Sequence, residues 1–277
     1  MKPFQILKTM TIASVPALTD PNEFKAFSLT KVEKLTETTS RFTFALPAGA
    51  TELGLPTASF IVIKYLKGVK DDGSPDVIFR PYTPIEDPSR GATGTFDLVV
   101  KRYPTGLVSN YIFGLKVGDS IELKGPILKY KYVANEFKHI GLVAGGTGIT
   151  PHLQIIQRVL SNPEDQTKLS LIFANVSVPE IILKDYIDNL VAQHPSRLSV
   201  YYTVDKPSAD WAGYSGYVSA DLITSALPKP GEGKVFVCGP PPFYAHVSGS
   251  KAPDFSQGEV GGLLANLGYT SEHVFKI

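Results

Sequence analysis

Residues 139–151 read His-Ile-Gly-Leu-Val-Ala-Gly-Gly-Thr-Gly-Ile-Thr-Pro, a short apolar run that ends in closely spaced glycines. The apolar part is typical of a buried strand, and glycines directly after a strand let backbone N–H groups approach a ligand. We expect a helix to begin here, with Thr150 as its N-cap and Pro151 as its first residue. The stretch therefore predicts a phosphate-binding strand–loop–helix unit. A glycine turn without a ligand is the alternative.

This glycine stretch differs from the common nucleotide-binding fingerprints. Pro151 stands where the G-x-G-x-x-G pattern has its third glycine, and no Lys-Ser or Lys-Thr pair follows as in a Walker A loop. The stretch alone does not name its ligand.

Downstream of residue 135, apolar runs alternate with helical patterns. We expect strands at 140–144, 169–174, 198–203 and 235–238, and helices at 151–160 and 179–193. In the second helix Ile182, Tyr186 and Leu190 recur at four-residue spacing. A strand about every 30 residues with a helix between predicts a doubly wound α/β domain with a parallel sheet.

The carboxyl ends of these strands carry the unusual residues. They end in Gly145–Gly148, 175–177, 203–205 and Cys238-Gly239-Pro240, and in open α/β sheets ligands bind at this edge. Asp205 suits a ribose hydroxyl and disfavours a 2′-phosphate, which favours NADH over NADPH; a turn aspartate is the alternative. Cys238 either borders a reacting ring or is a small buried side chain.

Upstream, the pattern is one of short alternating runs separated by Gly, Asp and Pro. Strands are expected at 40–46, 60–65, 77–82, 95–103 and 120–123, which predicts a small antiparallel β-barrel. We therefore expect a flexible leader over 1–26, a barrel domain over 27–133 and an α/β domain over 134–277.

Two barrel segments are candidates for ligand contacts. Arg80-Pro81-Tyr82-Thr83 places a cation, an aromatic ring and a hydroxyl together at the end of a strand, and arginine can bind a phosphate through two N–H groups. The alternative is a surface arginine beside a core tyrosine. Residues 106–109 are a loop leading into a helix, and thus either a second phosphate site or a plain helix start.

Composition excludes several classes of protein. The 277 residues carry a net charge of only +1, which argues against a nucleic-acid binder that relies on bulk charge. One cysteine cannot form an internal disulfide or ligate an iron–sulfur cluster. The five histidines lack metal-binding spacing, no G-x-S-x-G motif occurs, and no run approaches the ~20 apolar residues of a membrane span.

Taken in order, these motifs resemble the NADH–cytochrome b5 reductases of the ferredoxin-NADP reductase superfamily. The resemblance covers about residues 27–277. Residues 125–132, 257–259 and 274–277 are similar to the fungal mitochondrial branch. The resemblance implies FAD and NADH as cofactors and cytochrome b5 or a similar haem protein as partner. It also implies a mitochondrial location, at the outer membrane or in the intermembrane space, and we expect a monomer.

The resemblance also implies roles for individual residues. Thr83 would hydrogen-bond near the flavin N5, Lys101 would lie near the incoming NADH and Cys238 would border the nicotinamide; these three are the expected catalytic residues. The expected cofactor-binding residues are Arg80, Pro81, Tyr82, Thr83, Val100, Lys101, Tyr103, Gly106, Val108, Ser109, Gly146, Thr147, Gly148, Thr150, Pro151, Asp205, Cys238, Gly239 and Pro240.

Some positions depart from the family pattern. Leu107-Val108 stands where many relatives have Lys-Met, Phe60 where many have histidine, and Ile277 where an aromatic residue is common. A non-catalytic flavin- or nucleotide-binding module therefore remains one alternative. Another is a flavin reductase with a different acceptor, including one that prefers NADPH. For the haem partner, a local basic docking face would come from Lys101, Arg102, Lys124, Lys129 and Lys131.

Overall fold

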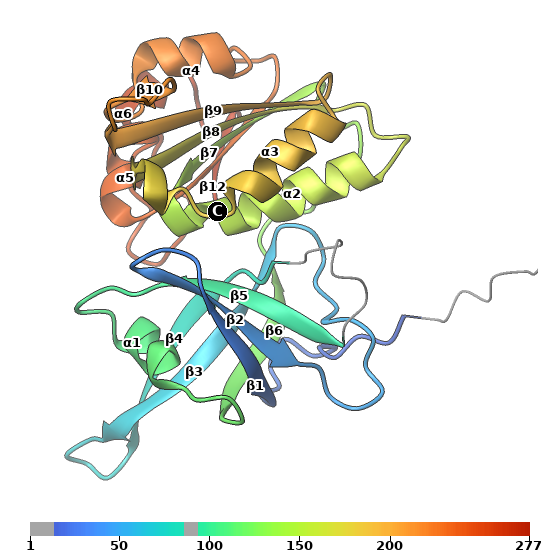
Figure 1. Ribbon diagram of the computed structural model, residues 1–277, viewed down its shortest axis with the longest axis vertical. Coiled ribbons are helices and arrows are strands. Elements are labelled where there is room, and N and C mark those ends of the chain that lie inside the picture. Colours follow the sequence, from blue (N-terminus) through green and yellow to red (C-terminus); the bar gives the residue numbers. More distant parts are fainter. Residues whose placement is uncertain (1–13, 86–93) are drawn as a thin grey trace, which may run out of the picture.

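The computed structural model describes residues 14–85 and 94–277, which form two domains stacked end to end (Figure 1). The first contains a six-stranded antiparallel sheet curled around its own core, and the second a six-stranded parallel sheet covered by helices on both faces. This is the predicted architecture of a barrel followed by a doubly wound α/β domain.

The barrel domain is built from strands that pair in the spatial order β4-β3-β6-β1-β2-β5. Its elements are β1 (Lys25–Lys34), β2 (Thr39–Ala45), β3 (Ser59–Val69), β4 (Pro75–Tyr82), β5 (Thr95–Lys101), α1 (Leu107–Gly114) and β6 (Ser120–Leu128). Period-two alternation directs Phe42 and Phe44 inward, where they are at most 1% exposed. Burial of such rings drives the closure of the sheet.

Part of the segment predicted to be a flexible leader belongs to the barrel. Ala17 and Leu18 are buried in the barrel core, Pro16 bridges Glu52, and β1 begins at Lys25. Residues 14–26 thus belong to the barrel because apolar side chains there find a place in its core, whereas residues 1–13 lie outside the described part of the chain.

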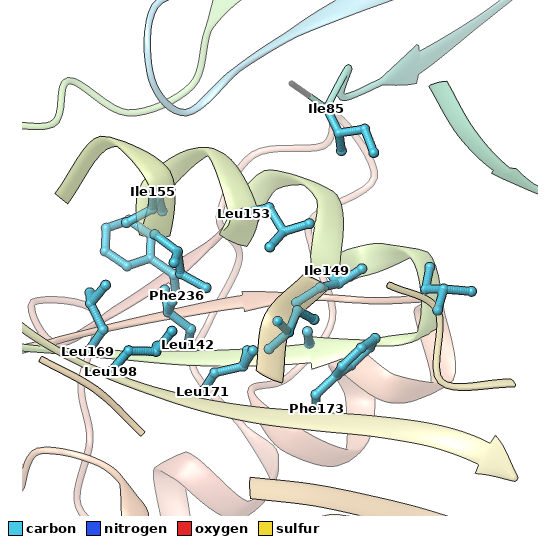
Figure 2. Packing of buried hydrophobic residues seen from close by; sticks show 14 of the residues in the cluster. Ile85, Leu142, Ile149, Leu153, Ile155, Leu169, Leu171, Phe173, Leu198 and Phe236 are labelled. Carbon is cyan, nitrogen blue, oxygen red and sulfur yellow. The ribbon is translucent and has the colours of Figure 1, made fainter. Parts of the chain in front are cut away.

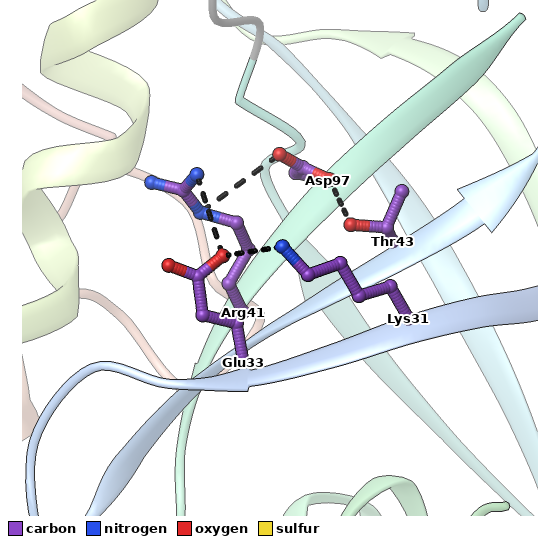
Figure 3. A network of polar contacts seen from close by, with 5 residues as sticks. All are labelled: Lys31, Glu33, Arg41, Thr43 and Asp97. Carbon is purple, nitrogen blue, oxygen red and sulfur yellow. Dashed lines mark hydrogen bonds and ion pairs between the residues drawn. The ribbon is translucent and has the colours of Figure 1, made fainter. Parts of the chain in front are cut away.

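A polar network on the barrel wall joins three strands (Figure 3). The Asp97 carboxylate on β5 accepts a 2.6 Å hydrogen bond from the Thr43 hydroxyl and lies 3.8 Å from the Arg41 Nε. Arg41 also lies 4.0 Å from Glu33, which pairs with Lys31. The network links β1, β2 and β5, so it holds in place the strand that ends at Lys101.

The α/β sheet has the order β10-β9-β8-β7-β11-β12, with every pair parallel. In sequence its elements are β7 (His139–Gly145), η2 (Gly146–Gly148), α2 (Ile149–Ser161), β8 (Lys168–Ser177), η3 (Val178–Glu180), α3 (Lys184–Gln193), β9 (Leu198–Lys206), β10 (Tyr214–Ser215), α4 (Ala220–Ala226), β11 (Lys234–Cys238), α5 (Pro241–Val247), α6 (Gly262–Asn266) and β12 (Val274–Lys276). α2 and α3 cover one face, and α4, α5 and α6 cover the other.

Two helix starts differ from prediction. α2 begins at Ile149 after Gly148, so Thr150 lies inside the first turn and is not the N-cap; its hydroxyl donates to the Thr147 carbonyl oxygen. α3 begins at Lys184, five residues later than expected, because Leu183 adopts a left-handed conformation with φ +57°. A left-handed residue cannot continue a right-handed helix.

The two domains share part of one core. Ala58, Ile85 and Val99 of the barrel belong to the cluster formed mainly by α2, α3 and the parallel sheet, and Figure 2 shows Ile85 beside α2 near Leu153. The Gln154 side chain on α2 bonds the barrel at two points. Its carbonyl oxygen accepts from the Ser59 N–H at 3.3 Å, and its amide nitrogen donates to the Pro84 carbonyl at 3.4 Å. These contacts fix the cleft between the domains.

The connection near the expected boundary at residue 134 packs against the α/β domain. Tyr130 and Tyr132 lie against its core, and the Tyr132 hydroxyl donates to Asp165 at 2.5 Å. The boundary itself stays a prediction.

Candidate functional site

A cavity of about 430 Å³ lies between the domains, at the carboxyl edge of the parallel sheet. The barrel contributes Lys101 and Tyr103 to its wall. The α/β domain contributes residues from four successive strand ends and the segments after them: Gly145, Gly146, Ala174, Asn175, Val176, Asp205, Tyr217, Val218, Pro240, Pro242, Phe243 and His246. The cavity therefore lies at the sheet edge where the sequence predicted ligand binding.

Five of the residues predicted from sequence line this cavity: Lys101, Tyr103, Gly146, Asp205 and Pro240. They are spread over 140 positions of the chain. Parallel pairing of β7, β8, β9 and β11 brings Gly146, Asp205 and Pro240 to one edge, and the barrel supplies Lys101 and Tyr103 opposite them. Gly146 has φ +55°, and a side chain there would meet no atom within 4 Å, so its backbone is open to the cavity.

Gly148 has a different role from the one expected. A Cβ atom at Gly148 would lie 2.2 Å from the Cys238 carbonyl oxygen, so the absence of a side chain lets two strand-end loops touch each other. Thr147 is half-buried, and Thr150 and Pro151 are buried in the first turn of α2. In this loop, Gly146 is the residue that lines the cavity.

Cys238 is half-buried at the end of β11 and is not among the lining residues. Burial raises the pKa of its thiol, against opposing effects of a hydrogen bond with Tyr244 and the charge of Lys251. The thiol is therefore protonated near neutral pH, and the expected place of Cys238 beside the nicotinamide stays a prediction. Gly239 permits close approach of the Phe243 ring, 2.4 Å from where its Cβ would be.

Several lining residues were missed by sequence reasoning. Tyr217 is 72% exposed, and its ring contacts His246, whose Nε2 bonds the Val218 carbonyl oxygen at 2.7 Å. Asn175 lies at the predicted strand end 175–177, and this position was the signal that could have indicated it as a site residue. Its side chain is buried, and its amide nitrogen has no hydrogen-bond partner among the described residues.

This arrangement fits a dinucleotide. An unpartnered buried amide costs free energy unless a ligand satisfies it. The exposed ring of Tyr217 can stack on a base, and the Asp205 carboxylate can accept hydrogen bonds from a ribose. The Lys101 ammonium can bind a phosphate. Burial raises the pKa of Asp205, and the nearby charge of Lys206 opposes this.

On the barrel side, the motif at residues 80–83 ends strand β4 and continues beyond it. Arg80 is exposed and donates to the Phe79 carbonyl at 2.8 Å, and Pro81 is also exposed. Tyr82 and Thr83 are half-buried, and burial raises the pKa of the Tyr82 hydroxyl to about 12. The motif thus offers a neutral aromatic ring and a guanidinium within four residues.

The second barrel loop leads into α1, whose N-cap residue is Gly106, and no side chain caps the helix. Ser109 donates to the Gly106 carbonyl at 3.0 Å and accepts from the Tyr103 N–H at 3.3 Å. Val100 and Val108 point into the barrel core, so only their backbone groups are left for a cofactor. Free N–H groups at the start of α1, together with the Arg80 guanidinium, fit the pyrophosphate of FAD.

The expected basic face is divided. Lys101 is paired inside the cleft with Glu180, and Arg102 bonds Asn110. Lys124 and Lys129 lie over the rings of Phe24 and Phe60 respectively. Among the residues that the structure describes, no cluster of His, Cys, Asp and Glu is arranged to hold a metal ion, and no helix could span a membrane.

Comparisons with known proteins give the same picture. A family profile described as an oxidoreductase FAD-binding domain matches residues 26–132, and one described as an oxidoreductase NAD-binding domain matches residues 142–249. The chain is 46% identical to an NADH-cytochrome b5 reductase-like protein of Arabidopsis thaliana, covering 93% of this chain and 77% of that protein. It is 42% identical to NADH-cytochrome b5 reductase 2 of Yarrowia lipolytica, covering 95% and 89%.

Solved structures agree. The cytochrome b5 reductase domain of Ulva prolifera nitrate reductase superposes with a TM-score of 0.78 at 31% identity, covering 95% of this chain and all of that one. A ferredoxin NADP+ reductase from Neisseria gonorrhoeae superposes with a TM-score of 0.67 at 18% identity, covering 92% and 98%, and shares the fold.

Proposed function

The chain belongs to the NADH–cytochrome b5 reductase family, and on that premise we propose which of its residues hold the cofactors that pass electrons from NADH to a haem protein. It is an FAD-dependent NADH oxidoreductase with one domain for each cofactor. The observation that carries the proposal is the cavity between the domains, because its wall combines Lys101 and Tyr103 of the barrel with four strand ends of the α/β domain.

The α/β domain binds and orients the nucleotide. Asp205 accepts hydrogen bonds from the adenosine ribose, and Lys101 offers a charge to the dinucleotide phosphates. Gly146 and Pro240 bring backbone close to the ligand, and the Asn175 amide provides a further polar contact. Fixing the nucleotide against the barrel provides the proximity on which hydride transfer depends.

The barrel holds the flavin. When bound, FAD would take up a hydride from NADH and give up its electrons one at a time. Arg80 and the start of α1 at Gly106 and Ser109 bind its pyrophosphate, Tyr82 packs on its ring system, and Thr83 hydrogen-bonds at its edge. Because the Tyr82 hydroxyl stays protonated to about pH 12, that ring remains neutral throughout the working range.

The acceptor is cytochrome b5 or a similar haem protein. Arg102, Lys124, Lys129 and Lys131 provide the docking charges, because none of them lines the cavity. Lys101 is left out of this face because its ammonium is paired with Glu180. Charges of this kind raise association rates more than affinity, and salt screens them.

A stopped-flow experiment tests the proposal. The purified protein, supplemented with FAD, should show flavin absorbance that NADH bleaches within the mixing experiment; added cytochrome b5 should then become reduced. Arg80→Ala should weaken FAD binding by about tenfold or more, the usual contribution of a charged hydrogen bond. A flavin that stays oxidised with NADH would identify a non-catalytic binding module, and reduced flavin that cannot reduce cytochrome b5 would require a different acceptor.

The choice of nucleotide is tested at Asp205. The wild type should prefer NADH because the carboxylate repels a 2′-phosphate, and Asp205→Ser should reduce that preference by about tenfold. The ratio of kcat/KM with NADH to that with NADPH measures this. A wild type that prefers NADPH would contradict the assignment.

We also propose a mitochondrial location and a monomeric state, both on the resemblance to the fungal branch. A fluorescently tagged full chain should co-localise with a mitochondrial marker in yeast. Light scattering of the holoenzyme should give the mass of one 30.0 kDa chain. A diffuse signal, or twice that mass, would contradict the respective proposal.

A further inference from the structure

One ion pair crosses from the barrel to the α/β domain. The Lys101 ammonium lies 3.2 Å from a Glu180 carboxylate oxygen, and the Thr38 hydroxyl donates to the same oxygen at 2.8 Å. The side chains of Lys101 and Glu180 are 23% and 17% exposed. Every other ion pair found within residues 14–85 and 94–277 stays inside one domain.

The fold places this pair next to the nucleotide cavity. Lys101 ends β5 and lines the cavity, whereas Glu180 ends the short 3-10 helix η3 that follows β8. Strand β8 also provides Asn175 and Val176 to the cavity wall. Glu180 is not a lining residue, so its contact with the cavity runs through Lys101.

Glu180 is ionised when it holds Lys101. Burial alone would raise the pKa of its carboxyl, but hydrogen bonds from Thr38 and Lys101 and the charge of Lys101 outweigh it, so the pKa lies below the ordinary value. A carboxylate beside the ammonium cancels much of the positive charge that the cavity offers to a pyrophosphate.

We propose that Glu180 is a positioning residue that competes with the nucleotide for the Lys101 ammonium, so that NAD+ is held weakly enough to leave after each turnover. The inference rests on the proposed function, because it assumes that NAD(H) occupies the cavity. Coupling is reciprocal: a nucleotide that draws Lys101 away weakens the tie between the domains, and a stronger tie weakens nucleotide binding.

Glu180→Gln tests the competition because it removes the charge and keeps the shape and an acceptor oxygen. In the FAD-loaded protein, titration calorimetry with NAD+ should give a dissociation constant about threefold to fivefold lower than wild type, the range of a partly exposed charge pair. Product inhibition by NAD+ should strengthen by the same factor. Thr38→Val, which removes a hydroxyl and no charge, is the matched control and should have a smaller effect.

A second background separates the charge effect from a structural one. With Lys101→Ala, adding Glu180→Gln should leave the NAD+ dissociation constant where Lys101→Ala put it, because no ammonium remains to compete for. An unchanged or higher dissociation constant in Glu180→Gln alone would overturn the inference, as would an equal decrease in the Lys101→Ala background. Wild-type holoenzyme that binds no NAD+ would overturn the proposed function as well.

Discussion

Helix α1 of the barrel and helix α2 of the α/β domain both begin directly after a glycine, and these two glycines do different things. At Gly106, before α1, an added Cβ would lie 2.4 Å from the Ser109 hydroxyl of the same helix. At Gly148, before α2, it would lie 2.2 Å from the Cys238 carbonyl oxygen, 90 residues away in sequence. Both segments carried the same prediction of a phosphate-binding turn.

The difference shows how each of the two proposed cofactor sites is constructed. The barrel loop is local, because Ser109 and Tyr103 bond within a few residues of Gly106. The α/β loop depends on tertiary contact, because its backbone rests on the end of β11. We therefore expect substitutions at the start of α2 to affect the whole nucleotide edge, and those at the start of α1 to stay local.

The largest effect is expected for Gly148→Ala. Gly148 has φ −60° and ψ −8°, a conformation that alanine adopts without strain, so the entire cost comes from the clash with the Cys238 backbone. We expect a loss of about 3 kcal/mol in the free energy of unfolding, at the upper end for overpacking. Urea denaturation of the FAD-loaded protein measures it.

Gly146→Ala is the matched control two residues earlier. Its φ of +55° is unfavourable for alanine, but the added Cβ meets nothing within 4 Å. The cost should be about 1 kcal/mol. If the control cost as much as Gly148→Ala, backbone conformation and not contact with β11 would decide the stability of this loop.

The next effect concerns His152, which is fully buried in α2. Burial lowers the pKa of its imidazole from 6.5 to about 4, against the hydrogen bond to the Phe236 carbonyl. Between these two values the unfolded chain takes up a proton that the folded chain does not. Stability should therefore fall by up to about 1.4 kcal/mol per pH unit below pH 6.5, and the contribution is absent above it.

His152→Met removes this titration, so the wild-type and variant curves of unfolding free energy against pH should converge as the pH falls from 6.5 toward 4. Urea midpoints at half-unit steps of pH measure the difference. Parallel curves would show that His152 takes up its proton as readily in the folded protein as in the unfolded chain, and that water therefore reaches the imidazole. Gly106→Ala, which changes no titratable group, should run parallel to wild type.

The smallest effect is expected for Gly106→Ala. The added Cβ would displace the Ser109 hydroxyl and break its 3.0 Å and 3.3 Å hydrogen bonds, a loss of about 1 kcal/mol. On a Ser109→Ala background the same substitution should cost less, because the clashing atom is gone. Equal costs in both backgrounds would contradict the local character of this turn.

Sequence reasoning succeeded where structure is local or periodic. Alternating runs predicted the strands that became β2 and β4, and the carboxyl ends of parallel strands correctly indicated where Asp205 and Gly146 would meet. It failed where pairing brings distant segments together. Tyr217 reaches the cavity because the two-residue strand β10 pairs beside β9, and so short a strand leaves no periodic signal.

The same limit applies to contacts between domains. Lys101 and Glu180 are 79 residues apart, and no spacing in the sequence relates them. The late start of α3 depends on the left-handed conformation of Leu183, which a leucine in a sequence does not indicate. Lys101 was predicted as a site residue and lines the cavity, but its partner Glu180 could be found only from the fold.

The shared core between the domains has a consequence for how such proteins can diversify. Ala58, Ile85 and Val99 fill spaces in the α/β cluster, and Gln154 of α2 bonds the barrel on both sides of that patch. A foreign nucleotide-binding half joined to this barrel would have to supply matching hollows and an equivalent amide. The two domains can therefore be exchanged only together. Substitutions on the interface of one domain are restricted by the surface of the other.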